Sequence, residues 1–400
     1  MTGKENVIAA ESQYVLQTYK RPPFVLERGE GMTLFDSEGR AYLDWVSGIA
    51  VNALGYRDAE ITRAAQSALD AGIIHLSNLY HSEAHTTVAR LLCEHSFADK
   101  VFFCNSGAEA NEGAIKFARR VSHNNDQPEK HELLCFSGAF HGRTTGALAL
   151  TPREAYQAPF RPLLPGVATA QFNDIESARA AIGPQTAAVI VEPLQGEGGI
   201  HPADPAFLKA LRTFCDEQDA LLIFDEIQCG LGRTGTLWAY ESFGVEPDIM
   251  TLAKPLAGGL PMGAILLRDS VARHIQAGDH GSTFAGGLLV ARVAEAVLER
   301  IRQPAFLNHV REVGTYLGDR LAEINLPCVV AQRGSGFLQG LELDIAAAPI
   351  VDACYEQGHI ITTAGANILR FVPPLIAERS QVDSLIEALT GVLQGATQND

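Results

Sequence analysis

The sequence predicts an α/β protein that has a large domain, built on a mostly parallel β-sheet, and a smaller α+β domain. Over the middle of the chain, short continuous apolar segments alternate with stretches of helical periodicity. This alternation is typical of parallel strands that helices cover on both faces. After about residue 305 the pattern changes to a helix, alternating strands and further helices. With 400 residues, of which 46% are hydrophobic, the chain can bury one large core and a smaller second one.

The predicted large domain covers residues 59–304. Apolar positions three and four residues apart indicate its helices, and short runs of apolar residues indicate its strands. The predicted elements, in chain order, are a helix at 59–71, a strand at 101–104, a helix at 108–121, strands at 132–136 and 187–191, a helix at 205–218, and strands at 221–224 and 249–253.

The two ends of the chain are predicted to pack together. Residues 1–58 contain two strand-like pieces around a Gly/Asp turn, and these pieces have no evident place in the large sheet. We therefore expect this segment to pack with a small C-terminal domain formed by residues 305–400. The expected elements are strands at 32–35 and 41–45, a helix at 306–324, strands at 329–331 and 337–343, another helix, and a closing helix after Pro374.

Charge and composition exclude several classes of function. The chain has 47 acidic and 31 basic residues, a net charge of -16 and a pI near 5.2. Nucleic acid and anionic membranes are therefore not expected as partners. No apolar run approaches the ~20 residues of a membrane span, and the N-terminus leads into no apolar signal segment. We expect a cytoplasmic protein whose seven cysteines, none in a Cys-x-x-Cys pair, are buried thiols, and we expect no metal site.

Two strand ends carry candidate catalytic groups. The apolar strand at 221–224 ends in Asp225, and in open α/β sheets ligands bind beyond the carboxyl ends of the strands. A lone acid at such a turn is more often structural, but the next apolar strand ends in Lys254, which has no charged neighbour between Asp248 and Arg268. Apolar surroundings lower the pKa of a lysine and suit it to Schiff-base chemistry. An amine and a carboxylate placed in this way are the groups that a pyridoxal phosphate site needs.

The strand at 101–104 leads into a candidate anion site. Ser106 can cap the following helix, and Gly107 leaves the backbone open to a ligand. The free N–H groups and the positive dipole end of a helix N-terminus bind phosphate well. Glu109 and Glu112 in the first turns fit an ordinary capped helix equally well, so this segment alone does not decide between the two interpretations.

Three other patterns bear on alternative functions. Residues 230–235 (GLGRTG) match a dinucleotide-binding fingerprint, which makes an NAD-dependent oxidoreductase the remote alternative, although five residues separate the strand from the first glycine. His81 and His85 have a metal-like spacing but no third ligand, so a solvated or capping pair is the simpler interpretation. No G-x-S-x-G sequence of an α/β-hydrolase is present.

Taken together, the motifs resemble the class III (ω-amino) pyridoxal-phosphate aminotransferases of fold type I. Two further segments, 48–55 and 278–286, are similar to segments of the same family. The five segments that carry the resemblance, in order and spacing, are 105–112 (NSGAEANE), 140–143 (FHGR), 191–199 (VEPLQGEGG), 224–228 (FDEIQ) and 251–254 (TLAK).

The resemblance implies a role for each matched residue. Lys254 and Asp225 are the implied catalytic residues, the first as nucleophile and proton carrier, the second as partner of the pyridine nitrogen. Gln228 is expected at the ring hydroxyl and Phe140 on the ring face. Thr283 is implied to reach the phosphate of a neighbouring subunit, which makes a homodimer with shared sites the expected assembly. The complete implied cofactor set is Ser106, Gly107, Ala108, Phe140, Glu192, Asp225, Gln228, Lys254, Ser282 and Thr283.

The resemblance also implies a substrate class. Arg143 and Arg370 match positions that clamp substrate carboxylates, Glu197 matches the acid that masks the second arginine, and Asn52 completes the implied substrate set. The expected reaction moves the δ-amino group of N2-acetylornithine to 2-oxoglutarate, a step of arginine biosynthesis. Ornithine, succinylornithine, carrier-protein-linked aminoadipate semialdehyde and GABA remain open as alternative substrates. The segment 285–288 and Pro255 depart from the usual family pattern, and neither carries a chemical group of the site.

Overall fold

The computed structural model describes residues 3–397 of the chain. Its largest element is a seven-stranded sheet in the order β4-β12-β11-β10-β7-β5-β6. Only β12 runs antiparallel to its neighbours β11 and β4, so the expected α/β class with a mostly parallel sheet is confirmed. The strands are β4 (Lys100–Cys104), β12 (Gly263–Leu267), β11 (Ile249–Leu252), β10 (Leu221–Asp225), β7 (Thr186–Val191), β5 (Glu132–Phe136) and β6 (Val167–Ala170).

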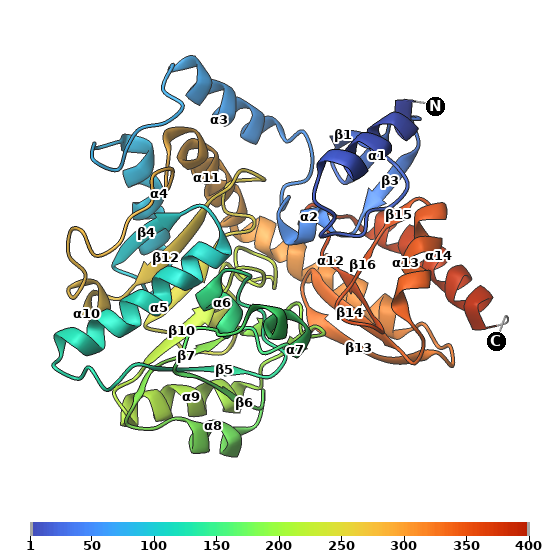
Figure 1. Ribbon diagram of the computed structural model, residues 1–400. Helices are drawn as coiled ribbons and strands as arrows, with labels where there is room; N and C mark the ends of the chain where they lie inside the picture. Colours follow the sequence, from blue (N-terminus) through green and yellow to red (C-terminus); the bar gives the residue numbers. More distant parts are fainter. Residues whose placement is uncertain (1–2, 398–400) are drawn as a thin grey trace.

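Helices cover both faces of this sheet (Figure 1). In β7, Ala188 and Ile190 belong to the apolar cluster formed with α5, whereas Val189 and Val191 belong to the cluster formed with α9. Because successive side chains of a strand point to opposite faces, a strand buried on both faces has a continuous apolar sequence. The helices of this part are α3 (Ala59–Asp70), α4 (Glu83–Glu94), α5 (Gly107–Asn124), α6 (Thr145–Ala149), α7 (Glu154–Gln157), α8 (Ile175–Ala181), α9 (Pro205–Glu217), α10 (Asp269–Ala272) and α11 (Leu288–Ile301).

The beginning and the end of the chain lie side by side (Figure 1). β3 pairs in parallel with β15, so one sheet in the order β1-β2-β3-β15 contains strands from both ends. The boundaries of the three segments proposed from the sequence stay a prediction. The N-terminal elements are α1 (Gly3–Tyr14), β1 (Leu26–Glu30), β2 (Thr33–Asp36), β3 (Ala41–Asp44) and the short α2 (Ser47–Ala50).

A second four-stranded sheet, in the order β13-β14-β17-β16, forms the centre of the C-terminal part. Two further short strands, β8 (Leu194–Gln195) and β9 (His201–Pro202), form a hairpin that follows β7. The C-terminal elements are α12 (Pro304–Ala322), β13 (Val329–Ser335), β14 (Leu338–Leu343), α13 (Ala347–Glu356), β15 (His359–Ile360), β16 (Thr362–Thr363), β17 (Ile368–Phe371) and α14 (Arg379–Thr397). Among the described helices, none combines the length and the apolar character that a membrane-crossing helix needs.

Candidate active site

A cavity of about 420 Å³ lies at the carboxyl end of the large sheet. Its walls come from the first turn of α5, the segment after β5, the end of β10 and the loop after β11. Of the residues expected from the sequence, ten line it: Ser106, Gly107, Ala108, Phe140, Arg143, Glu192, Glu197, Asp225, Gln228 and Lys254. The fold therefore brings together residues that are up to 148 positions apart in the chain, from Ser106 to Lys254.

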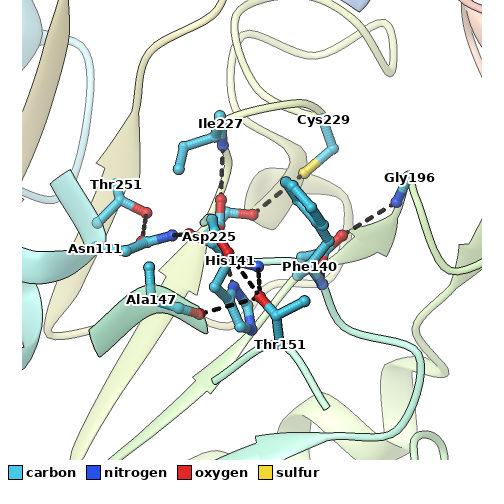
Figure 2. A network of polar contacts seen from close by, with 12 residues as sticks. Asn111, Phe140, His141, Ala147, Thr151, Gly196, Asp225, Ile227, Cys229 and Thr251 are labelled. Atoms are coloured by element: carbon cyan, nitrogen blue, oxygen red, sulfur yellow. Dashed lines mark hydrogen bonds and ion pairs between the residues drawn. The ribbon is translucent and has the colours of Figure 1, made fainter. Parts of the chain in front are cut away.

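Asp225 is held at the end of β10 by three hydrogen-bond partners (Figure 2). Its Oδ2 accepts from Asn111 Nδ2 at 2.8 Å and lies 2.7 Å from His141 Nδ1, and its Oδ1 accepts from the Ile227 N–H at 3.0 Å. The residue is 3% exposed, and buried carboxylates need such partners. The carboxylate is thus fixed in place at the inner wall of the cavity.

Sequence reasoning gave no role to the residues that hold Asp225. Asn111 lies one helical turn after the predicted anion site, and its Oδ1 accepts from Thr251 Oγ1 at 2.8 Å. The His141 N–H donates to Thr151 Oγ1 at 2.9 Å, while His141 Nε2 is buried without a partner among the described residues. Asn111 and His141 both lie inside the quoted motifs, but only the fold shows that they face Asp225 (Figure 2).

Lys254 follows β11, and its side chain lines the cavity. No hydrogen bond or ion pair joins its amine to another described residue. Burial lowers the pKa of Lys254, although the nearby Glu197 carboxylate acts in the opposite direction. A lysine amine with a lowered pKa and no fixed partner is suited to attack an aldehyde.

The N-terminus of α5 opens into the same cavity. Ser106 is the N-cap, and its Oγ accepts from the Glu109 N–H at 3.2 Å, which confirms its capping role. Gly107 and Ala108 belong to the first turn, where peptide N–H groups have no partner inside the helix. These groups and the helix dipole are suited to bind a phosphate.

Two buried or half-buried acids complete the inner part of the cavity. Glu192 accepts from the N–H groups of Phe140, at 2.8 Å, and Gly196, at 3.1 Å. Burial raises the pKa of Glu192 to about 7, and His141 opposes this effect. Glu197 binds Arg370, whose side chain is buried. Burial alone would raise the pKa of Glu197, but Arg370, together with the smaller effects of Lys254 and Arg153, holds the pKa below its ordinary value.

The two predicted substrate arginines differ in their surroundings. Arg370 Nη1 binds Glu197 and lies 3.4 Å from Gln228 Oε1. Arg143 is exposed, its guanidinium lies 3.3 Å above the centre of the Tyr156 ring, and no described carboxylate lies within ion-pair distance of it. One arginine is therefore occupied and the other is open.

Four predicted site residues are not among those that line the cavity of this chain. One is Arg370, which binds the cavity residue Glu197. Asn52 lies beside Tyr56, with 3.4 Å between Asn52 Nδ2 and Tyr56 Oη. Ser282 accepts from Asn105 Nδ2 at 2.9 Å, next to the N-terminus of α5, and Thr283 is exposed on the same loop. The position of such a loop in the sequence does not show whether the loop faces the cavity of its own chain.

The glycine and histidine patterns have structural explanations. Arg233, inside the segment 230–235, is buried and donates to the carbonyl groups of Phe337 and Pro373. The segment leads into a short 3₁₀ turn, Ala239–Ser242, instead of the helix that a dinucleotide site requires. His85 packs on Phe103 with 4.7 Å between ring centroids, and the described residues contain no cluster of three metal-ligating side chains.

The residues fit pyridoxal phosphate. Lys254 offers an amine to the cofactor's aldehyde, and Asp225 offers a fixed carboxylate to its ring nitrogen. The N-terminus of α5 offers free N–H groups to its phosphate. The fold and the site together define a pyridoxal-phosphate-dependent transferase.

Comparisons with known proteins identify the family. The family described as aminotransferase class-III matches residues 14–393, and the chain belongs to this family. It is 48% identical to the mitochondrial acetylornithine aminotransferase of Alnus glutinosa, over 96% of this chain and 87% of that protein. It is 45% identical to the acetylornithine aminotransferase of Methanocaldococcus jannaschii, over 98% of each chain. The NAD-dependent alternative is therefore wrong.

Solved structures agree with this assignment. The ornithine aminotransferase of Toxoplasma gondii ME49 matches with a TM-score of 0.95 at 28% identity, over 100% of this chain and 97% of that chain. The N-acetylornithine aminotransferase of Stenotrophomonas maltophilia K279a matches with a TM-score of 0.85 at 34% identity, over 98% and 100%. The predicted fold type and the aminotransferase class are confirmed.

Proposed function

We propose that the protein transfers the δ-amino group of N2-acetylornithine to 2-oxoglutarate and forms N-acetylglutamate 5-semialdehyde and glutamate. The observation that carries this proposal is the unequal occupancy of the two arginines. Arg370 is bound by Glu197, whereas Arg143 is open at the cavity. In this state the cavity offers one carboxylate site, which fits a donor with a single carboxylate far from its reacting amine.

The acids of the cavity favour an acylated donor. Glu192 is engaged by two peptide N–H groups, Glu197 by Arg370, and Asp225 by Asn111 and His141. No carboxylate that lines the cavity is left to pair with the α-ammonium group of free ornithine. An N2-acyl group removes this charge, and several relatives at 41–48% identity are named acetylornithine aminotransferases.

The cofactor supplies a ring that withdraws electrons from the reacting substrate carbon. Lys254 would hold its aldehyde, Asp225 its ring nitrogen and Ser106 to Ala108 its phosphate, while Gln228 and Phe140 line the wall beside the ring site. Once its amine is released by the substrate, Lys254 Nζ can carry the proton that moves during transfer. Because burial lowers the pKa of this amine from its ordinary value, the uncharged form that accepts the proton is favoured.

Glu197 lets one site accept two different substrates. The donor half of the reaction needs one open arginine, whereas 2-oxoglutarate has two carboxylates and needs both. When Glu197 leaves Arg370, a second carboxylate can take its place on the guanidinium. The same pocket then binds the diacid in an orientation that places its keto group at the reacting position.

A homodimer and a cytoplasmic location complete the proposal. Thr283 lies outside the cavity of its own chain, on an exposed loop, which supports a role in the site of a second copy. Exposed apolar side chains on this loop and on the segment after α3 support the same contact: Ile73, Ile74, Leu79, Tyr80 and Phe284. The seven cysteines are free thiols, which fits a reducing compartment. Light scattering after size exclusion measures the assembly directly.

The test of the reaction is an absorption spectrum of the purified holoprotein. Adding N2-acetylornithine without an acceptor should remove the visible band of the bound cofactor, and 2-oxoglutarate should restore it. A band that ignores N2-acetylornithine but responds to ornithine or GABA would refute the proposed donor. A protein that never shows the band after incubation with pyridoxal phosphate would refute the cofactor assignment.

A further inference from the structure

Three residues form a row across the C-terminal sheet. Arg333 on β13 pairs with Gly340 on β14, and Gly340 pairs with Arg370 on β17. Residues directly opposite each other in neighbouring strands point to the same face of a sheet. Arg333 and Arg370 therefore lie on one face of the sheet, with Gly340 between them. Their backbones are two strand spacings, about 10 Å, apart.

The loop that carries Glu197, residues 196–200 between β8 and β9, lies over this row. Arg370 binds the Glu197 carboxylate at one end, and Arg333 Nε donates to the Gly199 carbonyl oxygen at 2.7 Å at the other end. Ile200 sits above Gly340, where a Cβ would lie only 2.9 Å from Ile200 Cγ1. Because Gly340 has no side chain, the loop can pack closely against the sheet at this point.

The loop has a backbone conformation that its surroundings must hold. Gly199 has φ +112° and Ile200 has φ +58°. A positive φ is unfavourable for a β-branched residue, so contacts outside the loop have to maintain it. Arg333 provides such a contact. Its guanidinium is held in turn by Glu342, because Arg333 Nη1 donates to Glu342 Oε2 at 2.5 Å.

A second arginine holds the loop from the large-sheet side. Arg153 Nη2 donates to the Glu197 carbonyl oxygen. Because the carbonyl groups of Glu197 and Gly199 are both held, rotation of the Glu197 side chain can release Arg370 without breaking these backbone contacts.

We propose that Arg333 is a positioning residue that holds the Glu197 loop over Arg370, and thereby sets the preference of the site for an ω-amino donor over a dicarboxylate. This inference rests on the proposed function. Without the Arg333 contact the loop relaxes from its positive φ angles, Glu197 is held less firmly, and Arg370 becomes open to dicarboxylates during the donor half-reaction.

The test compares two half-reactions of the holoenzyme, measured separately by absorption with N2-acetylornithine and with glutamate. We compare the rate constant with N2-acetylornithine to the rate constant with glutamate. The Arg333→Ala variant should lower this ratio by about tenfold, because it removes one hydrogen bond of a charged group. Glutarate, a dicarboxylate without an amino group, should bind this variant several-fold more tightly in calorimetry. The Gly340→Ala variant displaces the loop without removing an arginine and should shift both quantities in the same direction.

Arg320→Ala is the matched control, because Arg320 lies on α12 of the same C-terminal part and pairs with Asp383 at 2.8 Å. A shifted ratio in Arg333→Ala and Gly340→Ala, with a wild-type ratio in Arg320→Ala, supports the inference. The inference is overturned if a folded Arg333→Ala variant has the wild-type ratio and the wild-type affinity for glutarate. If Arg333→Ala does not fold, a wild-type ratio and glutarate affinity in Gly340→Ala overturn the inference instead. The glutarate titration needs no amino donor, so it tests Arg333 even where wild-type protein ignores N2-acetylornithine and the proposed function fails.

Discussion

Glu226, the residue after Asp225, should make the stability of the protein fall as pH rises. The residue is 1% exposed, and its Oε2 accepts from the Ala239 N–H at 2.7 Å and its Oε1 from the Tyr240 N–H at 2.8 Å. No described cation pairs with it. Burial raises the pKa of Glu226 from its ordinary value of 4.5 to about 8, because the two hydrogen bonds only partly replace the lost hydration.

The sign and size of the effect follow from these two pKa values. Below pH 4.5 the carboxyl is protonated in both the folded and the unfolded chain. Between pH 4.5 and about 8 the unfolded chain loses the proton while the folded chain keeps it, so the free energy of unfolding decreases as pH rises through this window. From pH 4.5 to 7 the loss is about 3 kcal/mol at 1.36 kcal/mol per pKa unit. For a chain of this length it corresponds to about 3–4 °C in Tm.

Glu226→Gln keeps the shape of the side chain and removes the titration. Calorimetric Tm values of both proteins at pH 5, 6 and 7 should show the wild type losing about 3 °C relative to the variant over this range. Glu387→Gln, at an exposed position of α14, controls for the removal of a carboxylate. A wild type that gains stability relative to Glu226→Gln as pH rises would show that the two N–H groups hold the carboxylate ionised, and the reasoning from burial would be refuted.

Three substitutions test the chemistry of the site. Lys254→Ala should lower kcat by at least about 10²–10⁴-fold, the usual contribution of a proton carrier, and wild-type turnover would contradict its assigned role. Asp225→Ala removes a carboxylate held by Asn111 and His141, and should weaken cofactor retention in dialysis about tenfold or more; undiminished retention and activity would count against a ring-nitrogen partner. Glu197→Ala unmasks Arg370, so glutarate should bind about 10–100-fold more tightly in calorimetry, since a charge-assisted hydrogen bond no longer has to be broken. Unchanged glutarate affinity would show that Glu197 does not compete for this arginine.

The sequence predicted the central sheet well because its signal is local. Strands buried on both faces, such as β5 and β10, have continuous apolar sequences whose limits agree with the structure within one residue. Two strands of this sheet, β6 (Val167–Ala170) and β12, were not predicted. Gly263–Leu267 of β12 follows the glycine-rich loop after Lys254, and no helix precedes it. Its antiparallel direction is set by that short connection, which a search for alternating strands and helices does not detect.

The candidate site was predicted through its motifs, and its supporting contacts were not. Asp225 ends β10, Lys254 lies two residues after β11, and Ser106 caps α5, so their positions follow from local pattern. Asn111 and His141 act on Asp225 from elements that meet only in the folded chain. No spacing rule connects residues that are 114 and 84 positions from their partner.

The two carboxylates that matter most for the reaction differ in how firmly they are held, and this difference follows from their tasks. Asp225 has three partners from separate elements and is 3% exposed, so any displacement breaks several buried hydrogen bonds. Glu197 has one side-chain partner, Arg370, whose Nε remains without a partner among the described residues. An unsatisfied buried donor is costly, and a substrate carboxylate that binds Arg370 in two places can satisfy it where Glu197 alone does not. Under the proposed function, the structure thus fixes the group that must not move during transfer, and leaves incomplete the pair that would open for the second substrate.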